Sequence, residues 1–486
     1  MTQGAIRRPA LSSRELVGVA GSVVVCGVAF LAFPVSLGVT SSYVAAGVFR
    51  GVWAGLAGGL LLPNRSWRAA AGAAALGALL GGCAANLGLD ALAAWEVALA
   101  ALLAAGVASG VSWMCRRGWQ RVAVGLAILC IVVGLAWQIG LVAGPFSGAQ
   151  REFLRTTATE PATEGYHFDG QIYLKTMFLM KRGTPYFVAF SQAVKEDTRY
   201  LEPPPLVFNY REAWPARFVT LLPGNPGIAA WATFFALVLI GILGAYLLAS
   251  QFLAPGAALL GPMLLVSYFA FPLTTKWFPL VEFWAGALAV LAIALFARER
   301  WWAAAVAVTI AVATRELMVY LIPVGLFAWL AYPKRRAVVL PVAAMVLLPC
   351  VVLGYHALSS PGTLGAGGQS VGVASWLHGS LWSLLAALRF SSNHLVWGKL
   401  VAMAVPLVAV VGAAQVPLLW RKVLLASVVV VPAVALALFS TGVFGYYWGA
   451  IMQPVALAIA PLALVFALPR AESAKRAGSS GGLAGT

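Results

Sequence analysis

The sequence predicts an all-α, polytopic transmembrane helical bundle of about 13 or 14 membrane helices. Hydrophobic residues occupy 62% of the 486 positions, charged residues occupy only 10%, and the mean hydropathy is +0.90. Soluble domains carry roughly 25% charged residues. Continuous apolar runs, long enough to cross a bilayer core of about 30 Å, recur along the chain and are typical of membrane helices rather than of membrane strands.

The apolar runs divide the chain into three predicted regions. Residues 1–121 form an N-terminal four-helix membrane module with spans at 16–39, 43–63, 69–88 and 91–115. Residues 122–470 form a membrane core with spans at 122–146, 227–250, 252–272, 278–296, 301–314, 317–332, 337–357, 398–419, 423–440 and 448–468. Residues 471–486 are small and polar, which predicts a disordered cytoplasmic tail.

Two of the predicted spans are short. The run 301–314 would make about 21 Å of helix at 1.5 Å per residue. With 317–332 it forms a hairpin whose tip carries Arg315 and Glu316. Because charges are costly in hydrocarbon, we expect this tip to end below the outer surface, in a protein cavity.

The formal charge of +17 is explained by membrane orientation. Short Lys and Arg clusters follow apolar runs, and the positive-inside rule assigns them to the cytoplasm. With the N-terminus inside, six clusters fall on that side: Arg65/Arg68, Arg116/Arg117/Arg121, Arg298/Arg300, Lys334/Arg335/Arg336, Arg421/Lys422 and Arg470/Lys475/Arg476. Both termini are therefore predicted to be cytoplasmic, in a plasma membrane. No basic stripe interleaved with aromatics is present, so nucleic acid is not an expected partner.

The same orientation places most polar chemistry outside. Apart from short turns in the N-terminal module, the external segments are 147–226, 273–277, 315–316, 358–397 and 441–447. The first holds eight of the fifteen acids and is far longer than ordinary helix connections. All four histidines lie in or beside external segments: His167, His356, His378 and His394.

The most informative run is Tyr166 to Tyr173, in which Asp169 precedes a glycine and aromatic residues flank it. A helix is predicted over 171–182, with Gln171, Lys175 and Arg182 on one polar face, as in helices of the membrane interface. A carboxylate at that boundary can take a proton from a sugar hydroxyl. The alternative role for Asp169 is a helix N-cap, which the pattern alone favours.

This run resembles the first external loop of GT-C class glycosyltransferases, which use polyprenyl-phosphate sugars as donors. In that class an acidic residue follows a span, and a jutting helix and a Gly/Pro-Tyr turn come next; here residues 167–173 and 182–186 read HFDGQIY and RGTPY. Residues 208–211 and 215–218, FNYR and PARF, resemble the aromatic-Arg-Pro stretch that leads back into the membrane. The similarity covers 122–470 by the order and spacing of short motifs.

The resemblance implies a GT-C-like fold and an inverting glycosyltransferase with Asp169 as general base. Its partners would be a polyprenyl-phosphate sugar donor, a lipid or glycan acceptor of the cell envelope, and membrane lipids. The implied substrate-binding residues are His167, Tyr173, Arg211, Lys276, Glu282, Arg315, Glu316 and His394. Among these, Arg211, Lys276, Arg315 and His394 would stabilise the departing phosphate, although interfacial snorkelling explains any single one of them. Glu282 would pair with Arg315 or Lys276, or orient the acceptor.

Two features depart from the family pattern. Four helices precede the catalytic loop, so residues 1–121 would be an added module. The paired acidic motif of many members is missing, because Gly170 follows Asp169. A divalent metal is therefore only weakly supported, and no other cofactor is expected. Usage rich in Ala, Gly and Trp is typical of GC-rich bacterial genomes such as those of actinobacteria, where mannosyl or arabinosyl transfer is the expected chemistry.

A membrane transporter or a lipid or polysaccharide flippase is the alternative. The helix count favours it, as do Arg50 and Glu96, which fall in or near spans of the N-terminal module. Transporters commonly show discontinuous helices at matching positions in two halves of the chain. Here the short pair at 301–332 has no counterpart in the first half. A non-catalytic scaffold for envelope assembly is a third possibility.

Overall fold

The computed structural model describes residues 94–119, 169–195, 213–253, 257–274, 277–359, 381–392, 398–438 and 448–464, and nine isolated positions between 52 and 125. Helices dominate this part of the chain, which contains no strand, so the all-α prediction is confirmed for it. The predicted span 16–39, the tail 471–486 and Arg50 lie outside the described residues.

Ten of the described helices follow the predicted apolar runs. They are α4 (Ala94–Arg116), α9 (Pro226–Ala249), α10 (Leu260–Thr274), α11 (Val281–Ala297), α12 (Trp301–Thr314), α13 (Leu321–Ala331), α14 (Val339–Ser359), α17 (Gly398–Gln415), α18 (Leu419–Leu438) and α19 (Gly449–Ile459). Short 3-10 turns adjoin four of them: η2 (Ala257–Leu259), η3 (Glu316–Tyr320), η4 (Arg335–Val338) and η6 (Ala460–Leu464). Helix α12 coincides with its predicted span.

Four further helices lie in the segments predicted to be external. They are α6 (Asp169–Lys181), α7 (Tyr186–Lys195), α8 (Ala213–Leu221) and α16 (Leu381–Ser392). The sequence predicted the first of them. All four have 13 residues or fewer and are too short to cross a bilayer core, which takes about 20 residues.

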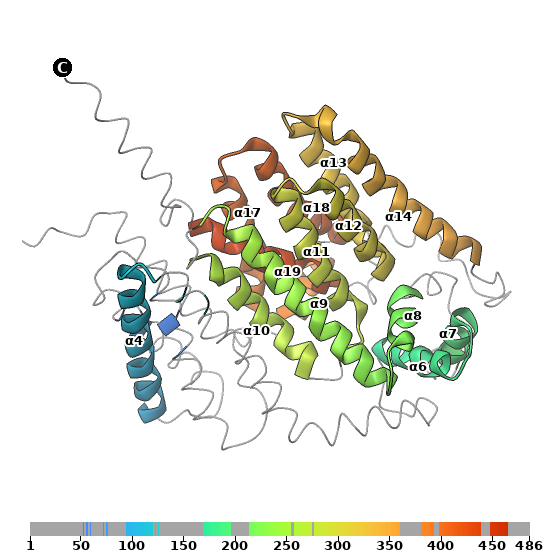
Figure 1. Cartoon of the computed structure of the whole chain (residues 1–486), viewed down its shortest axis with the longest axis horizontal. Coiled ribbons are helices and arrows are strands. Elements are labelled where there is room, and N and C mark those ends of the chain that lie inside the picture. The colour runs from blue at the N-terminus through green and yellow to red at the C-terminus, as the bar shows by residue number, and fades with distance from the viewer. Residues whose placement is uncertain are drawn as a thin grey trace, which may run out of the picture.

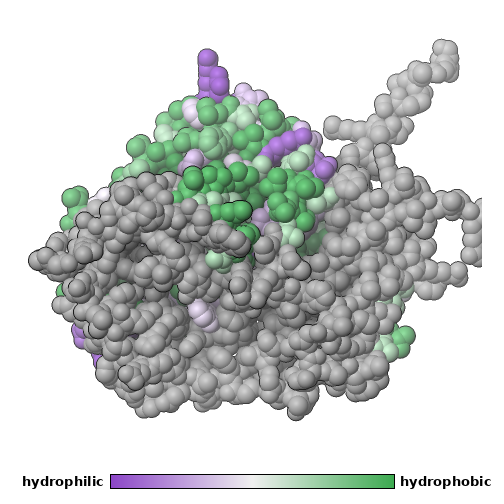
Figure 2. Space-filling model, turned by 180° about the vertical axis from the view of Figure 1, so that it is seen from behind, coloured by the Kyte–Doolittle hydropathy of each residue, from purple (hydrophilic) through white to green (hydrophobic). Residues whose placement is uncertain are grey.

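Three of the described helical segments are long and apolar enough to cross a membrane: Pro226–Ala249, Arg335–His356 and Leu419–Leu438. Apolar side chains are exposed along the outer helix α14, among them Leu340 and Val351. Figure 2 shows that the described part of one face is largely hydrophobic. A polytopic bundle is compatible with these features.

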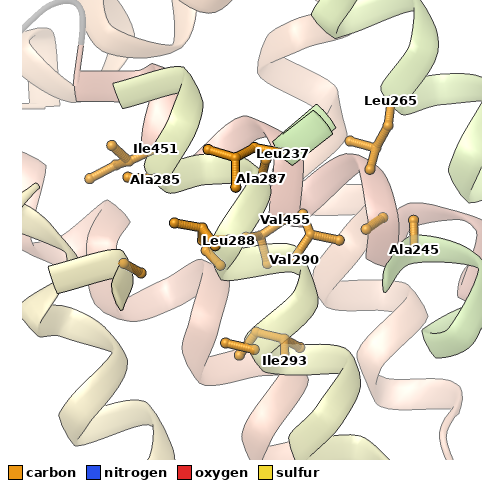
Figure 3. Close-up of a cluster of buried hydrophobic side chains, with 14 of the residues drawn as sticks. Leu237, Ala245, Leu265, Ala285, Ala287, Leu288, Val290, Ile293, Ile451 and Val455 are labelled. Atoms are coloured by element: carbon orange, nitrogen blue, oxygen red, sulfur yellow. The ribbon is translucent and has the colours of Figure 1, made fainter. Parts of the chain in front are cut away.

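Helix α11 is the centre of the described bundle (Figure 1). Fifteen of its seventeen residues are buried, and α9, α12 and α19 pack around it. Figure 3 shows Leu237 of α9, Leu288 of α11 and Val455 of α19 within one apolar cluster. A helix that is apolar on all sides belongs in such an interior position.

Small residues let the neighbours of α11 approach closely. A Cβ atom on Gly244 of α9 would lie 3.0 Å from Leu291 Cα, and one on Gly286 would lie 3.1 Å from the Ala450 carbonyl oxygen of α19. Glycine at such positions removes the side chain that would hold the two backbones apart. The close packing fixes α11 with respect to both neighbours.

Glycines also allow close helix packing in the N-terminal region. Gly55 and Gly59 lie one helical turn apart in the predicted span 43–63 and face α4. A Cβ on Gly55 would clash with the Ala104 carbonyl oxygen, and one on Gly59 would lie 2.7 Å from that of Ala108. Both obstacles are backbone atoms, which cannot rotate out of the way.

We therefore expect Gly55→Ala to destabilise the full-length protein by about 1–3 kcal/mol, the usual cost of overpacking. Gly106→Ala is the matched control, because a Cβ there meets nothing within 4 Å. That change should stabilise its helix by up to about 1 kcal/mol through propensity alone. Thermal unfolding in detergent should show midpoint shifts of opposite sign, and equal shifts would contradict the close packing on α4.

Candidate functional site

Three charged side chains meet where the α12–α13 hairpin turns beside the start of α11. Arg315 Nε lies 2.9 Å from Glu282 Oε1, and Arg315 Nη1 lies 2.8 Å from Glu316 Oε1. The side chains of Glu282 and Arg315 are 0% exposed, whereas that of Glu316 is 25% exposed. The predicted pairing of Glu282 with Arg315 is confirmed.

Local backbone structure explains how the three groups converge. Arg315 ends α12 in an extended conformation (φ −147°, ψ 118°), and η3 begins at Glu316. The turn is closed by the Met318 backbone N–H, which donates to the Arg315 carbonyl oxygen over 2.9 Å. Glu282 lies in the first turn of α11, where the helix dipole favours a carboxylate.

Buried aromatic side chains lie on α10 and α11, the helix that carries Glu282. The hydroxyl of Tyr268 on α10 donates to the Ala450 carbonyl oxygen over 3.3 Å. Trp284 Nε1 donates to the Phe278 carbonyl oxygen over 2.6 Å, and its ring stacks on Phe234. Because the side chains of Glu282 and Arg315 are both fully buried, the attraction between them is stronger than at a surface.

Helix α8 links the hairpin tip to the helices of the predicted external loop. Trp214 Nε1 donates to Thr314 Oγ1 over 2.8 Å, one residue before Arg315. At the other end of α8, Lys181 Nζ donates to the carbonyl oxygens of Thr220 (3.1 Å) and Leu222 (2.7 Å). A cation suits that position, because the last carbonyls of a helix lack partners. Figure 1 shows α6, α7 and α8 grouped beside one end of α9.

The structure describes some of the predicted site residues fully, one by its backbone alone, and others not at all. Asp169 is the first residue of α6, and only its backbone placement is described. Tyr173 is 1% exposed and stacks on Phe190 at a centroid distance of 6.5 Å, so it packs inside the α6–α7 pair. Four candidates lie outside the described residues: His167, Arg211, Lys276 and His394. The structure thus brings together Glu282, Arg315 and Glu316.

The predicted polar face of α6 is not uniformly exposed. Gln171 is buried (8% exposed), whereas Lys175, predicted to lie on the same face, is partly exposed. Packing of α6 against α7, α8 and α9 covers that position. Arg182 is exposed but follows the last residue of α6.

Sequence reasoning missed Trp214 and Thr314. Ninety-nine positions separate the two residues along the chain, so neither leaves a local signal that points to the other. Their hydrogen bond places α8 beside the hairpin tip. Arg217, one turn later on α8, was noted only as part of a motif.

Metal binding gains no support from the described residues, since no three His, Cys, Asp or Glu side chains gather there. No protein-family model matches the chain, and no curated protein or solved structure does. The resemblance to GT-C glycosyltransferases therefore stays a prediction.

We expect Glu282→Gln to destabilise the full-length protein by about 3–5 kcal/mol, because it breaks a buried ion pair on one side. The double variant Glu282→Gln/Arg315→Gln should regain part of this loss, because no buried guanidinium then lacks Glu282, and Glu316, which loses Arg315, is partly exposed. Equilibrium unfolding in detergent measures each variant. Additive losses in the double variant would contradict a direct energetic coupling.

The Trp214–Thr314 hydrogen bond should contribute a coupling energy of about 0.5–1.5 kcal/mol. A double-mutant cycle with Trp214→Phe and Thr314→Val removes each partner while keeping its approximate shape. Unfolding of the four proteins gives the coupling. A value near zero would show that α8 is not fastened to the hairpin at this point.

Proposed function

We propose that this chain is an integral membrane glycosyltransferase. It transfers a sugar from a polyprenyl-phosphate donor to a lipid or glycan acceptor of the cell envelope. One observation carries the proposal: a buried Arg315 with two carboxylates at a hairpin tip, joined through α8 to the helix that Asp169 begins. Buried charged groups in an apolar bundle are expensive, and function is a common reason for their presence.

The proposal includes a membrane orientation. The basic residues of η4 at the start of α14 lie in the cytoplasm, and α14 ends at the outer face. In the predicted topology α12 starts on the cytoplasmic side, so its Arg315 end is directed outward. The termini are cytoplasmic, the membrane is a bacterial plasma membrane, and the fold is GT-C-like.

In the reaction, the Asp169 carboxylate takes the proton of an acceptor hydroxyl. The hydroxyl oxygen attacks the anomeric carbon as the bond from that carbon to the phosphate oxygen breaks. The sugar is transferred with inversion, and polyprenyl phosphate leaves with the bonding electron pair. Cationic groups near the phosphate lower the barrier by stabilising this charge.

The charge cluster suits the acceptor side of this reaction better than the phosphate side. Among the described residues, two carboxylates contact one guanidinium, so the charge of Arg315 is already balanced there. Arg315 is then a positioning residue that holds Glu282 and Glu316. The partly exposed Glu316 carboxylate can accept hydrogen bonds from sugar hydroxyls.

The test uses the full-length protein in liposomes with radiolabelled polyprenyl-phosphate mannose or arabinose and a membrane-lipid acceptor extract. Asp169→Asn should lower the transfer rate about 10²–10⁴-fold, the usual contribution of a general base. Glu299→Gln is the matched control, because it makes the same chemical change just beyond the other end of α11, where Glu299 bonds with Tyr332. It should retain activity.

Undiminished transfer by Asp169→Asn would remove the catalytic assignment. Movement of labelled lipid across the bilayer without consumption of the donor would support a flippase and contradict the enzyme. Both variants should unfold at temperatures close to that of the unmodified chain.

A further inference from the structure

Side chains of two other elements fasten α8 at both of its ends. In its first turn, Trp214 Nε1 donates to Thr314 Oγ1 of the α12 end over 2.8 Å. At its last turn, Lys181 Nζ donates to the carbonyl oxygens of Thr220 (3.1 Å) and Leu222 (2.7 Å). Hydrogen bonds are directional, so bonds at two points fix both the position and the orientation of this short helix.

Lys181 supplies a group that α8 lacks. The last turn of α8 holds no basic residue, and the last carbonyl groups of a helix have no partner within it. A cation that donates hydrogen bonds stabilises such an end. The donor comes from α6, 39 and 41 positions earlier in the chain than the two carbonyls, so the bonds join separate helices.

Asp169 and Lys181 lie at opposite ends of α6, which has 13 residues. The two residues are therefore roughly 18 Å apart along the helix axis, at 1.5 Å per residue. A tilt of about 5° at the Lys181 end would move the backbone of Asp169 by roughly 1.5 Å. A misplacement of that size is enough to slow a reaction that needs aligned atoms.

The α6 helix can pass such a movement along its whole length. Leu174 and Met177 are 0% exposed, and the buried Tyr173 stacks on Phe190 of α7. A helix packed this closely transmits a displacement instead of absorbing it. The apolar contacts of α6 with α8 and α9 are non-directional, so the alignment of α6 with α8 depends on the Lys181 bonds.

We propose that Lys181 is a positioning residue for the sugar transfer. Its two hydrogen bonds to the end of α8 set the place of Asp169 relative to Glu316 at the hairpin tip, because α8 is bonded to that tip through Trp214. Lys181 acts through Asp169 and not on the substrate. This inference rests on the proposed function, since the position of Asp169 matters only if its carboxylate is the general base.

The first measurement is transfer by the full-length protein in liposomes, with radiolabelled polyprenyl-phosphate mannose or arabinose as donor. Lys181→Met keeps the length of the side chain and removes its donors, so kcat should fall about 10–10²-fold while the KM for the acceptor stays the same. Lys181→Arg should restore most of the rate, because a guanidinium also donates to carbonyl oxygens. Lys334→Met is the matched control, because it makes the same chemical change at an exposed lysine before η4. It should leave kcat unchanged.

The second measurement is amide hydrogen exchange in detergent, which needs no activity. Lys181→Met should speed exchange in α6 and α8 and leave α11 as it is, whereas Lys181→Arg and Lys334→Met should leave all three helices unchanged. Faster exchange together with the fall in kcat supports the inference.

Three results would overturn the inference: an undiminished kcat in Lys181→Met, an equal loss in Lys181→Arg, or a lower kcat with unchanged exchange, which would mean that Lys181 acts on the substrate directly. An undiminished kcat in Lys181→Met leaves the proposed function intact. Absence of transfer by the unmodified chain overturns the proposed function and this inference with it, so the two failures are distinct results.

Discussion

The ion pair between Glu282 and Arg315 is the constraint on which the rest of the described structure depends. Each charge removed from water costs several kcal/mol, and the pair offsets this only if the two groups are held at hydrogen-bonding distance. Here the separation is 2.9 Å, both side chains are 0% exposed, and a second carboxylate lies 2.8 Å from the same guanidinium. The helices that carry them must therefore be placed within narrow limits.

Packing of α11 provides that placement. Glycines at the α9 and α19 contacts let the three helices approach until their backbones nearly touch, which leaves α11 little freedom to slide or rotate. Glu282 is then fixed at one end of α11, and the ion pair requires the hairpin tip to place Arg315 beside it. The hairpin tip in turn fixes Thr314, whose bond with Trp214 places α8. The hydrogen bonds from Lys181 to the end of α8 then place α6, the helix that begins with Asp169.

The sequence predicts those parts of this arrangement that leave a pattern along the chain. Long apolar runs gave α9, α11 and α12 nearly to the residue, and the cost of isolated charges in such runs predicted a partner for Glu282. Helices α7, α8 and α16 fall in segments without such runs, so length gave no indication of them. The burial of Gln171 and the bond between Trp214 and Thr314 arise from tertiary packing, which overrides local pattern.

The charge balance of the hairpin tip limits what it can do in the proposed transfer. Among the described residues, two carboxylates contact the Arg315 guanidinium, so its charge is already balanced there. In the proposed reaction an acceptor hydroxyl needs a hydrogen-bond acceptor, whereas a leaving phosphate needs cations. The tip therefore suits the acceptor better than the phosphate. Because α8 is hydrogen-bonded both to the hairpin tip and to α6, it holds Glu316 and the helix that begins at Asp169 in a set relation.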